Sequence, residues 1–293
     1  MSGDLFEQLA DVGLLGNVWP PERVMVGMAV CRSLREHLPA GAASCVVVVC
    51  RNRGVPAAIT DMKCPLFVRA CAAHPGTARG ASTATWLQAL QGARIETLGL
   101  ARCALGAEKC AVLASLLQTG PRTCPGALAP ALTLRELDLS HNAISAEHVA
   151  LFRALGGLAN LRVLNLAGNT LQARGCGMLA AAVAGLNFED GRRADENSKR
   201  PPCAGLRQLS TLRIGGNDLG DEALPCLLDV IPQLTSLSLS ENKIGDEGVA
   251  CLAPALATSA ALQFLDLSRN LITDEGERAL SRVLRRRMQV ALS

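Results

Sequence analysis

The sequence is poor in aromatic residues and contains no tyrosine. Aromatic side chains make up 2% of the 293 residues, whereas hydrophobic residues as a class make up 49%. A core that relies on packed rings is therefore excluded. The core must consist mainly of leucine, alanine and valine, as expected of a well-packed chain with one or two domains.

Strong net charge and long apolar runs are also missing. The formal net charge is +3, which is too small to indicate a nucleic acid or a membrane surface as partner. The apolar run CVVVVC at 45–50 is far too short to span a membrane. The N-terminus holds Asp4 and Glu7 but no basic region, so it predicts no secretory signal. We therefore expect an intracellular protein, in the cytoplasm or the nucleus.

Motifs for catalysis and metal binding are absent as well. The sequence has no G-x-S-x-G, no Walker loop, and no C-x-x-C among its 12 cysteines. Cys64, Cys71 and His74 lie close together in sequence, but no fourth ligand accompanies them. Cys226 and Cys251 occupy matching places in two predicted helices and are interpreted as small core residues. We expect reduced cysteines, no metal, no cofactor and no enzymatic activity.

One phrase is repeated along residues 95–293. It reads L-x-x-L-x-L-x-x-N-x-L, and its copies begin at Ile95, Leu134, Leu161, Leu209, Leu234 and Leu262. The alternating leucines of each copy predict a short strand with one buried face. An Asn after the strand can satisfy backbone groups in a turn, so its repetition predicts a ladder of hydrogen bonds. The ladder residues are Asn142, Asn169, Asn217, Asn242 and Asn270, and Cys103 takes this place in the first copy.

A helix is predicted after each Asn. Asp-Glu pairs follow Asn242 and Asn270, where acidic groups favour a helix start, and apolar residues then recur at helical spacing. Each unit is thus strand, turn and helix. The phrase resembles that of the leucine-rich repeat family, of the ribonuclease-inhibitor-like type. The resemblance implies an α/β solenoid, a horseshoe with a parallel concave sheet and convex helices, that binds other proteins.

The repeats occupy only part of the chain. Residues 95–293 form the predicted solenoid, residues 41–94 a connecting region or degenerate first repeat, and residues 1–40 a helical segment. Within 41–94, the sequence predicts a strand at Val46 to Val49 and a helix at Ser82 to Gln91. Two insertions, one before Asn142 and one at 188–203, are predicted to be surface loops. The second is either a solvated excursion or a partner-binding element.

The residues between the buried leucines are predicted to face the concave surface. Exposed aromatic and Arg side chains are the usual hot spots of protein interfaces, so Phe264, Arg213 and Arg269 are the first candidates. The alternative is a sheet face that is merely solvated. The predicted binding residues are Glu136, Asp138, Asn165, Arg213, Phe264 and Asp266 on the strands, and His141, Glu241 and Arg269 beyond the strands.

Residues 5–38 contain two apolar segments around a Pro-Pro turn. One helix is predicted at Leu9 to Val18 and another at Glu22 to Leu38. The segment resembles an F-box, although Ala10 replaces the family's opening Pro and Leu34 stands where Trp is frequent. The resemblance implies docking on the Skp-type adaptor of cullin–RING ubiquitin ligases. The residues involved would be Leu9, Leu14, Pro20, Pro21, Val30 and Leu34. The alternative is a helical cap that covers the first repeat.

Three functional classes follow from these patterns. The first is a protein-binding adaptor, with recruitment of substrates for ubiquitination as its finer form. The second is a scaffold or sensor solenoid, and the third is an activator of a Ran-type GTPase, with Arg102 as the candidate residue. Catalysis by paired carboxylates is not expected, because Asp138 and Asp266 lie four repeats apart. The sequence alone names neither the partner nor the oligomeric state.

Overall fold

The computed structural model describes residues 23–27, 44–50, 66–71, 95–118, 133–186, 188–189, 192–193, 205–283 and 288–292. Its main feature is a sheet of 10 strands, in the order β1-β2-β3-β4-β5-β6-β9-β10-β11-β12. Every pairing in this sheet is parallel, as expected when each strand is followed by a helical return. The strands are β1 Arg23–Gly27, β2 Ser44–Cys50, β3 Leu66–Cys71, β4 Ile95–Gly99, β5 Glu136–Asp138, β6 Val163–Asn165, β9 Thr211–Arg213, β10 Ser236–Ser238, β11 Phe264–Asp266 and β12 Gln289–Ala291.

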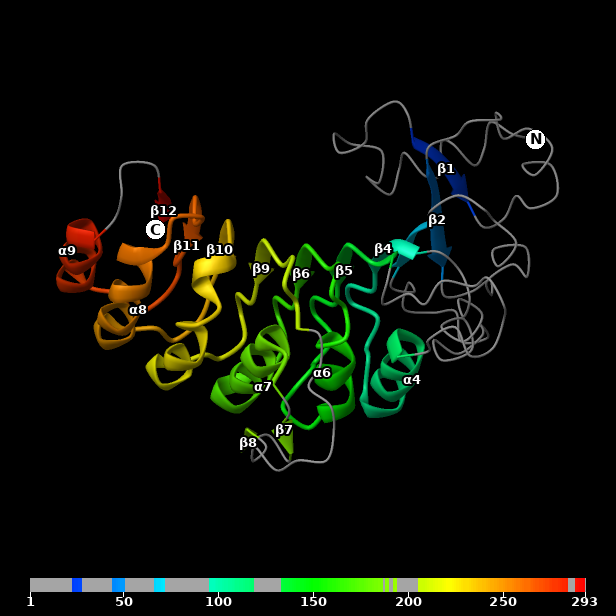
Figure 1. Cartoon of the computed structure of the whole chain (residues 1–293), viewed down its shortest axis with the longest axis horizontal. Coiled ribbons are helices and arrows are strands. Elements are labelled where there is room, and N and C mark those ends of the chain that lie inside the picture. The colour runs from blue at the N-terminus through cyan, green and yellow to red at the C-terminus, as the bar shows by residue number, and fades with distance from the viewer. Residues whose placement is uncertain are drawn as a thin grey trace.

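Helices cover one face of the sheet, and the whole is curved (Figure 1). The strands from β4 to β12 line the inner side of the arch, and the helices lie outside them. The helical segments are α4 Ala107–Gln118, α6 Val149–Leu155, α7 Gln172–Ala184, the 3-10 helices η2 Asp221–Leu227 and η3 Ile231–Gln233, α8 Asp246–Thr258 and α9 Asp274–Val283. The structure thus confirms the predicted open α/β solenoid. None of the helices described is long and apolar enough to cross a membrane.

The core lies between the sheet and the helices and runs continuously from repeat to repeat. From β4 to β11, each strand of this sheet carries a fully buried leucine that is in register with the buried leucines of the flanking strands. Burying a leucine side chain contributes about 1.5–3 kcal/mol, so the repeated phrase makes a large contribution to the apolar stabilisation. The strand leucines are Leu98, Leu137, Leu164, Leu212, Leu237 and Leu265.

The predicted asparagine ladder is present. Asn169 shows its pattern: its Oδ1 accepts the backbone N–H of Asn142 at 3.0 Å and of Ile144 at 2.9 Å. Its Nδ2 donates to the carbonyls of Leu139 at 3.1 Å and Leu166 at 2.7 Å. Each Asn therefore joins two repeats and satisfies backbone groups that have no strand partner.

The first rung of the ladder lacks an amide. Buried Cys103 can only donate weakly through its Sγ, to the carbonyl of Ala101 at 3.5 Å. Its backbone N–H donates to Oδ1 of Asn142 at 2.8 Å, just as the Asn142 N–H donates to Oδ1 of Asn169. This joint therefore keeps the hydrogen bond from the next repeat and lacks only the side-chain amide of the first rung.

The repeat after Asn217 departs from the α-helical expectation. It carries the 3-10 helices η2 and η3 in place of one α-helix. Pro225 lies inside η2 and Pro232 lies in η3, and neither can donate a backbone hydrogen bond. The helical segment is therefore divided into two short pieces.

In the N-terminal region the structure contradicts one predicted element and confirms another. The predicted helix from Glu22 to Leu38 is wrong at Arg23–Gly27, which forms β1 and pairs with β2. Val24 and Val26 pair with β2, and this pairing outweighs the helical spacing of the apolar residues. Strand propensity depends on tertiary neighbours, which the spacing does not show. The strand predicted at Val46 to Val49 is confirmed as part of β2, whereas β3 was not predicted. The F-box-like residues Leu9, Leu14, Pro20, Pro21, Val30 and Leu34 lie outside the described residues.

The predicted surface loops are described only in part. The insertion before Asn142 falls mainly on 119–132, outside the described residues, as does the helix predicted at Ser82 to Gln91. Within 188–203, Phe188–Glu189 (β7) and Arg192–Arg193 (β8) form a small antiparallel pair. The sequence did not predict this strand pair. The pair lies on the helix side of the arch, below α7 (Figure 1).

Candidate functional site

The strand residues that alternate with the buried leucines form two rows across the sheet. The register places Glu136 beside Val163, which lies beside Thr211, and the row continues through Ser236 to Phe264. The second row runs from Asp138 through Asn165 and Arg213 to Ser238 and Asp266. The structure thus brings the strand residues of the predicted site onto one face. Their role in binding stays a prediction.

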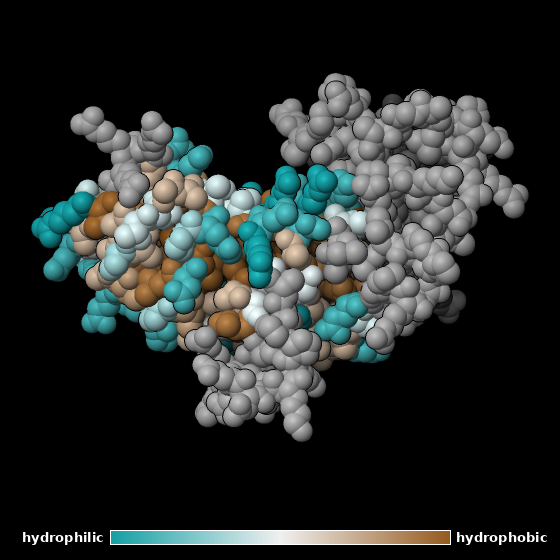
Figure 2. Space-filling model, viewed as in Figure 1, coloured by the Kyte–Doolittle hydropathy of each residue, from teal (hydrophilic) through white to brown (hydrophobic). Residues whose placement is uncertain are grey.

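The side chains in these rows differ in how far they reach into solvent. Glu136, Arg213 and Phe264 are exposed, whereas Asp138 and Asp266 are half-buried. Phe264 is 39% exposed, which is unusual for a large apolar side chain and leaves its ring available for contact. Along the strands, hydrophilic side chains gather at the centre of the arch (Figure 2).

The two half-buried aspartates are engaged by neighbouring serines. Asp266 accepts hydrogen bonds from the Ser268 hydroxyl at 2.6 Å and the Ser238 hydroxyl at 3.1 Å. Burial opposes ionisation of Asp266, but the serine hydrogen bonds outweigh it and lower the pKa of its carboxyl. Asp138 accepts from the Ser140 hydroxyl at 2.7 Å. These carboxylates therefore stabilise turns and are less available to a ligand.

A third row runs along the rim, one residue before each ladder position. All six of its residues have a left-handed backbone, with φ between 55° and 65°. Their amides donate to the next repeat, for example His141 N to Ala167 O at 2.8 Å and Glu241 N to Ser268 O at 2.9 Å. The row consists of Arg102, His141, Gly168, Gly216, Glu241 and Arg269. His141, Glu241 and Arg269 of the predicted site thus lie beside the sheet rather than on it.

The centre of this rim is formed by two glycines. A Cβ on Gly168 would overlap the imidazole of His141, which leans across the glycine backbone. At the other side, Glu241 and Arg269 form an ion pair of 2.6 Å, with both side chains more than half exposed. Such an exposed pair contributes at most about 1 kcal/mol, so a partner can replace it without a large loss of stability.

Two exposed arginines beside the rows were not predicted. Arg135 and Arg162 occupy the same place in neighbouring repeats, directly before β5 and β6. The Arg162 amide donates to the Arg135 carbonyl at 2.7 Å, so the two backbones lie side by side. The signal was present in the sequence, because LREL and LRVL carry Arg at the same position of the phrase. Strand alternation alone does not predict that this position faces the concave surface. Arg135 and Arg162 are therefore not among the predicted binding residues.

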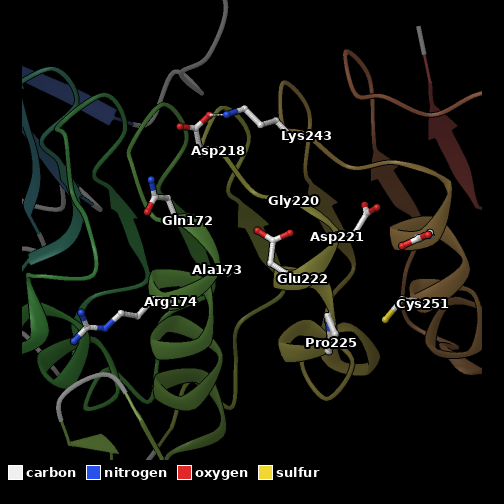
Figure 3. A pocket seen from close by; sticks show the side chains of 11 residues that line it. Gln172, Ala173, Arg174, Asp218, Gly220, Asp221, Glu222, Pro225, Lys243 and Cys251 are labelled. Carbon is white, nitrogen blue, oxygen red and sulfur yellow. Dashed lines mark ion pairs between the residues drawn. The ribbon is translucent and has the colours of Figure 1, made fainter.

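An open pocket of about 940 Å³ lies on the helix side, between α7, η2 and α8 (Figure 3). It lies where η2 replaces an α-helix. Its polar groups are largely engaged within the protein: Lys243 and Asp218 form an ion pair of 2.8 Å, which raises the pKa of Lys243. Asp221 accepts the backbone N–H of Gly245 at 2.7 Å. We assign this pocket a structural origin and no ligand.

The cysteines and carboxylates give little support for catalysis. Burial raises the pKa of Cys110 to about 11 and that of Cys176 to about 12, so both thiols stay protonated near neutral pH. The interpretation of Cys226 as a core residue is wrong, because Cys226 is exposed on η2, while Cys251 is half-buried on α8. The two helix types rotate side chains differently, so matching sequence positions do not face the same way. Among the described residues, no group of three metal-binding side chains comes together.

Comparison with known proteins identifies the repeats. Residues 132–147, 157–180, 232–253 and 259–281 match the family model described as Leucine Rich repeat. These segments are similar to leucine-rich repeats. The phrases at β4 and β9 have the same strand geometry and the same ladder position, so they continue the solenoid beyond the matched segments.

Similar solved structures come from bacteria. Internalin C2 of Listeria monocytogenes is 22% identical, with 64% of this chain and 75% of that chain covered and a TM-score of 0.33. A Bacteroides fragilis protein is 15% identical, covering 100% and 82% with a TM-score of 0.44. InlP of Listeria monocytogenes is 15% identical, covering 91% and 60% with a TM-score of 0.37. No curated protein matches the chain.

Proposed function

We propose that this leucine-rich repeat protein acts by binding a protein partner on the concave face of its sheet. The observation that carries the proposal is the face of β5 to β11, which no helix of the described residues covers. There, side chains from five successive repeats are presented together while the leucines behind them are buried. Stacked repeats create extended surfaces of this kind rather than enclosed catalytic pockets.

Phe264, Arg213 and Arg269 are the expected energetic centre of the contact. Phe264 supplies an exposed apolar ring, and Arg213, two repeats away, supplies a cation with no ion-pair partner among the described residues. Aromatic and Arg side chains dominate the binding energy of most interfaces. Arg269 can exchange its exposed contact with Glu241 for a carboxylate of the partner.

Site-specific photocrosslinking tests the face that is used. Benzoylphenylalanine is placed at Thr211 or Phe264 on the sheet, and at exposed Ala111 of α4 or Ala250 of α8 as matched controls. The full chain is irradiated in extract of the cells that express it, and adducts are identified by mass spectrometry. We expect the same adduct from both sheet positions and none of it from the helix positions. The same adduct from the helix positions alone would overturn the proposal.

Purified partner then gives the energetic test. Phe264→Ala should weaken binding about tenfold, in the range of interface hot spots. Leu271→Ala is the matched control, because Leu271 is also an exposed apolar side chain, 66% exposed, but lies beyond the sheet. Equal losses for both variants would show that the partner does not depend on the concave face.

The finer proposal is recruitment of a substrate to a cullin–RING ubiquitin ligase in the cytoplasm or nucleus. It is supported only by the sequence pattern at 5–38, part of which forms β1 rather than a helix. Binding of the full chain to a purified Skp-type adaptor tests it, with Val30→Asp/Leu34→Asp as the variant expected to lose binding. No binding by the folded full chain would leave a scaffold role. Arg102 occupies a rim position that His141, Glu241 and Arg269 occupy in other repeats, with the same backbone conformation. Nothing in its position therefore gives particular support to stimulation of a GTPase.

A further inference from the structure

Three exposed arginines of the central repeats have no carboxylate partner in the described part of the chain. Arg135 and Arg162 directly precede β5 and β6, and Arg213 ends β9, the next strand of the sheet. The ion pairs that the structure describes lie elsewhere, on Arg174, Lys243, Arg269 and Arg278. The three central arginines are therefore available for an external anion. We call Arg135, Arg162 and Arg213 the arginine strip.

Neighbouring strands set the spacing of the strip. Arg135 and Arg162 are adjacent across the sheet through the hydrogen bond between their backbones, at 2.7 Å. Adjacent parallel strands are about 4.8 Å apart, so the two cations start from neighbouring positions and repel each other. Arg213 lies one strand further and three positions along, level with Asn165. The strip thus runs obliquely from the start of β5 to the end of β9.

The acidic residues close to the strip are hydrogen-bonded to other groups and form no described ion pair with it. Asp138 accepts hydrogen bonds from the hydroxyl and the amide of Ser140, at 2.7 Å and 3.0 Å. Glu136 accepts from the Thr97 hydroxyl at 3.3 Å, on the side of the sheet away from Arg213. Both carboxylates are thus hydrogen-bonded to Thr97 or Ser140, and neither forms a described ion pair with an arginine of the strip.

We propose that the arginine strip binds an acidic, extended segment of the protein partner, and this inference rests on the proposed concave-face function. The guanidinium group binds carboxylates through two parallel hydrogen bonds, which gives orientation as well as attraction. An oblique row of cations on a sheet matches a chain whose carboxylates recur along its length. The exposed ring of Phe264, two strands beyond β9, lies outside the strip and contacts another part of the partner.

Fluorescence anisotropy with a labelled poly-glutamate peptide tests the inference on the full chain. We expect saturable binding that weakens as salt is added, because exposed charges are screened. Arg162→Gln/Arg213→Gln should weaken it more than about tenfold, and Arg162→Lys/Arg213→Lys should lie between this variant and the natural chain. Circular dichroism confirms that each surface variant is folded.

The control is Arg282→Gln on α9, which removes the same charge from an exposed residue that also has no ion-pair partner among the described residues. It should leave the affinity unchanged. Because Arg282→Gln removes one positive charge, it is compared with a third variant, the single Arg162→Gln. An equal loss in these two single variants would show attraction by net charge alone and overturn the strip. No binding of poly-glutamate by the natural chain would overturn it as well.

The two proposals fail in different ways. If a partner crosslinks at Thr211 and poly-glutamate does not compete with it, the concave-face function stands and the acidic-segment inference is overturned. If no partner crosslinks at the sheet positions but poly-glutamate binds through the strip, the proposed function fails while the strip is retained as an anion site. If poly-glutamate competes with the partner on the natural chain but not on Arg162→Gln/Arg213→Gln, both proposals are supported.

Discussion

At the residue scale, buried asparagine makes the repeats into one structure. Each ladder Asn uses both ends of its amide, so its two neighbours are held in a fixed register. A hydroxyl or thiol cannot do this, because it lacks separate donor and acceptor groups at that spacing. Cys103 illustrates the point, since its Sγ donates to the Ala101 carbonyl of its own repeat, whereas Asn142 Nδ2 reaches the Leu100 carbonyl of the preceding repeat.

Asn169→Ala is expected to be strongly destabilising. Asn169 is 6% exposed, and its removal leaves the Asn142 and Ile144 amides without an acceptor. We expect a loss of about 2–4 kcal/mol in the free energy of unfolding, measured by urea denaturation. Asn165→Ala is the control, since the half-exposed side chain of Asn165 accepts a single described hydrogen bond, from Ala167 N. Similar losses in both variants would contradict the importance of the ladder.

The lowered pKa of Asp266 predicts an acid-sensitive contribution to stability. A depressed carboxyl pKa stabilises the fold above the unfolded pKa, near 3.8, and this contribution is lost as the pH falls through the lower folded value. Ser268→Ala removes the 2.6 Å hydrogen bond and should raise the Asp266 pKa. The variant should be less stable than the natural chain at neutral pH, and the difference should shrink below about pH 3. Carboxyl carbon chemical shifts of Asp266 measure the pKa directly, and an unchanged value would contradict this assignment.

At the element scale, the helix starts form a second line of contacts between repeats. The Asp221 carboxylate accepts the amide of Gly245, and the Asp246 carboxylate accepts the amide and hydroxyl of Thr273 at 2.9 Å and 2.6 Å. The hydrogen bonds from Thr273 lower the pKa of Asp246. Consecutive helices are thereby joined at their N-termini, in parallel with the ladder at the strand ends.

Gly248→Ala tests this second line. A Cβ at Gly248 would overlap the Asp221 carboxylate and approach Leu224 Cδ1 to 2.6 Å. Alanine is otherwise the better residue in a helix, by about 1 kcal/mol, so a loss of stability requires the clash to outweigh the propensity. We expect a net loss of about 1–3 kcal/mol in thermal or urea unfolding.

Gly106→Ala is the matched control. Gly106 directly precedes α4, and no heavy atom lies within 4 Å of the position that its Cβ would take. Its substitution should change the free energy of unfolding by less than about 0.5 kcal/mol. A Gly248→Ala variant as stable as the natural chain would mean that the Asp221 carboxylate can move away from α8 without loss of stability.

At the scale of the whole molecule, one core extends through the repeats, and each repeat contacts chiefly its neighbours. Stability in such an array is a sum of repeat and interface contributions. A change in a central repeat therefore weakens the interfaces on both sides. The exposed concave face carries little of this stability, which leaves its side chains free to vary with the partner.

Leu237→Ala should show this coupling. Leu237 is fully buried in β10, between Leu212 and Leu265 of the adjoining strands. We expect a loss of about 2–5 kcal/mol. Hydrogen exchange should increase in β9 and β11 as well as in β10. Leu271→Ala, at a side chain that is 66% exposed, should leave exchange unchanged. Faster exchange restricted to β10 would contradict nearest-neighbour coupling.

The sequence by itself determined the repeats, because their information is local. A strand leucine and a ladder Asn are required at the same place in each copy, so the phrase predicted the sheet register and both rows on the concave face. The six residues of the strand rows assigned to the predicted site were found where expected. Whether they bind a partner is a question of surface chemistry that repetition does not answer.

Only the tertiary structure decided the features that depend on neighbouring repeats. It placed His141 over Gly168, engaged Asp266 with serines of two repeats, and brought Arg162 beside Arg135. It also turned Arg23–Gly27 into a strand against its helical period, through pairing with β2. These contacts join residues that are far apart in the chain, and their energies depend on distance and burial in three dimensions rather than on spacing in the sequence.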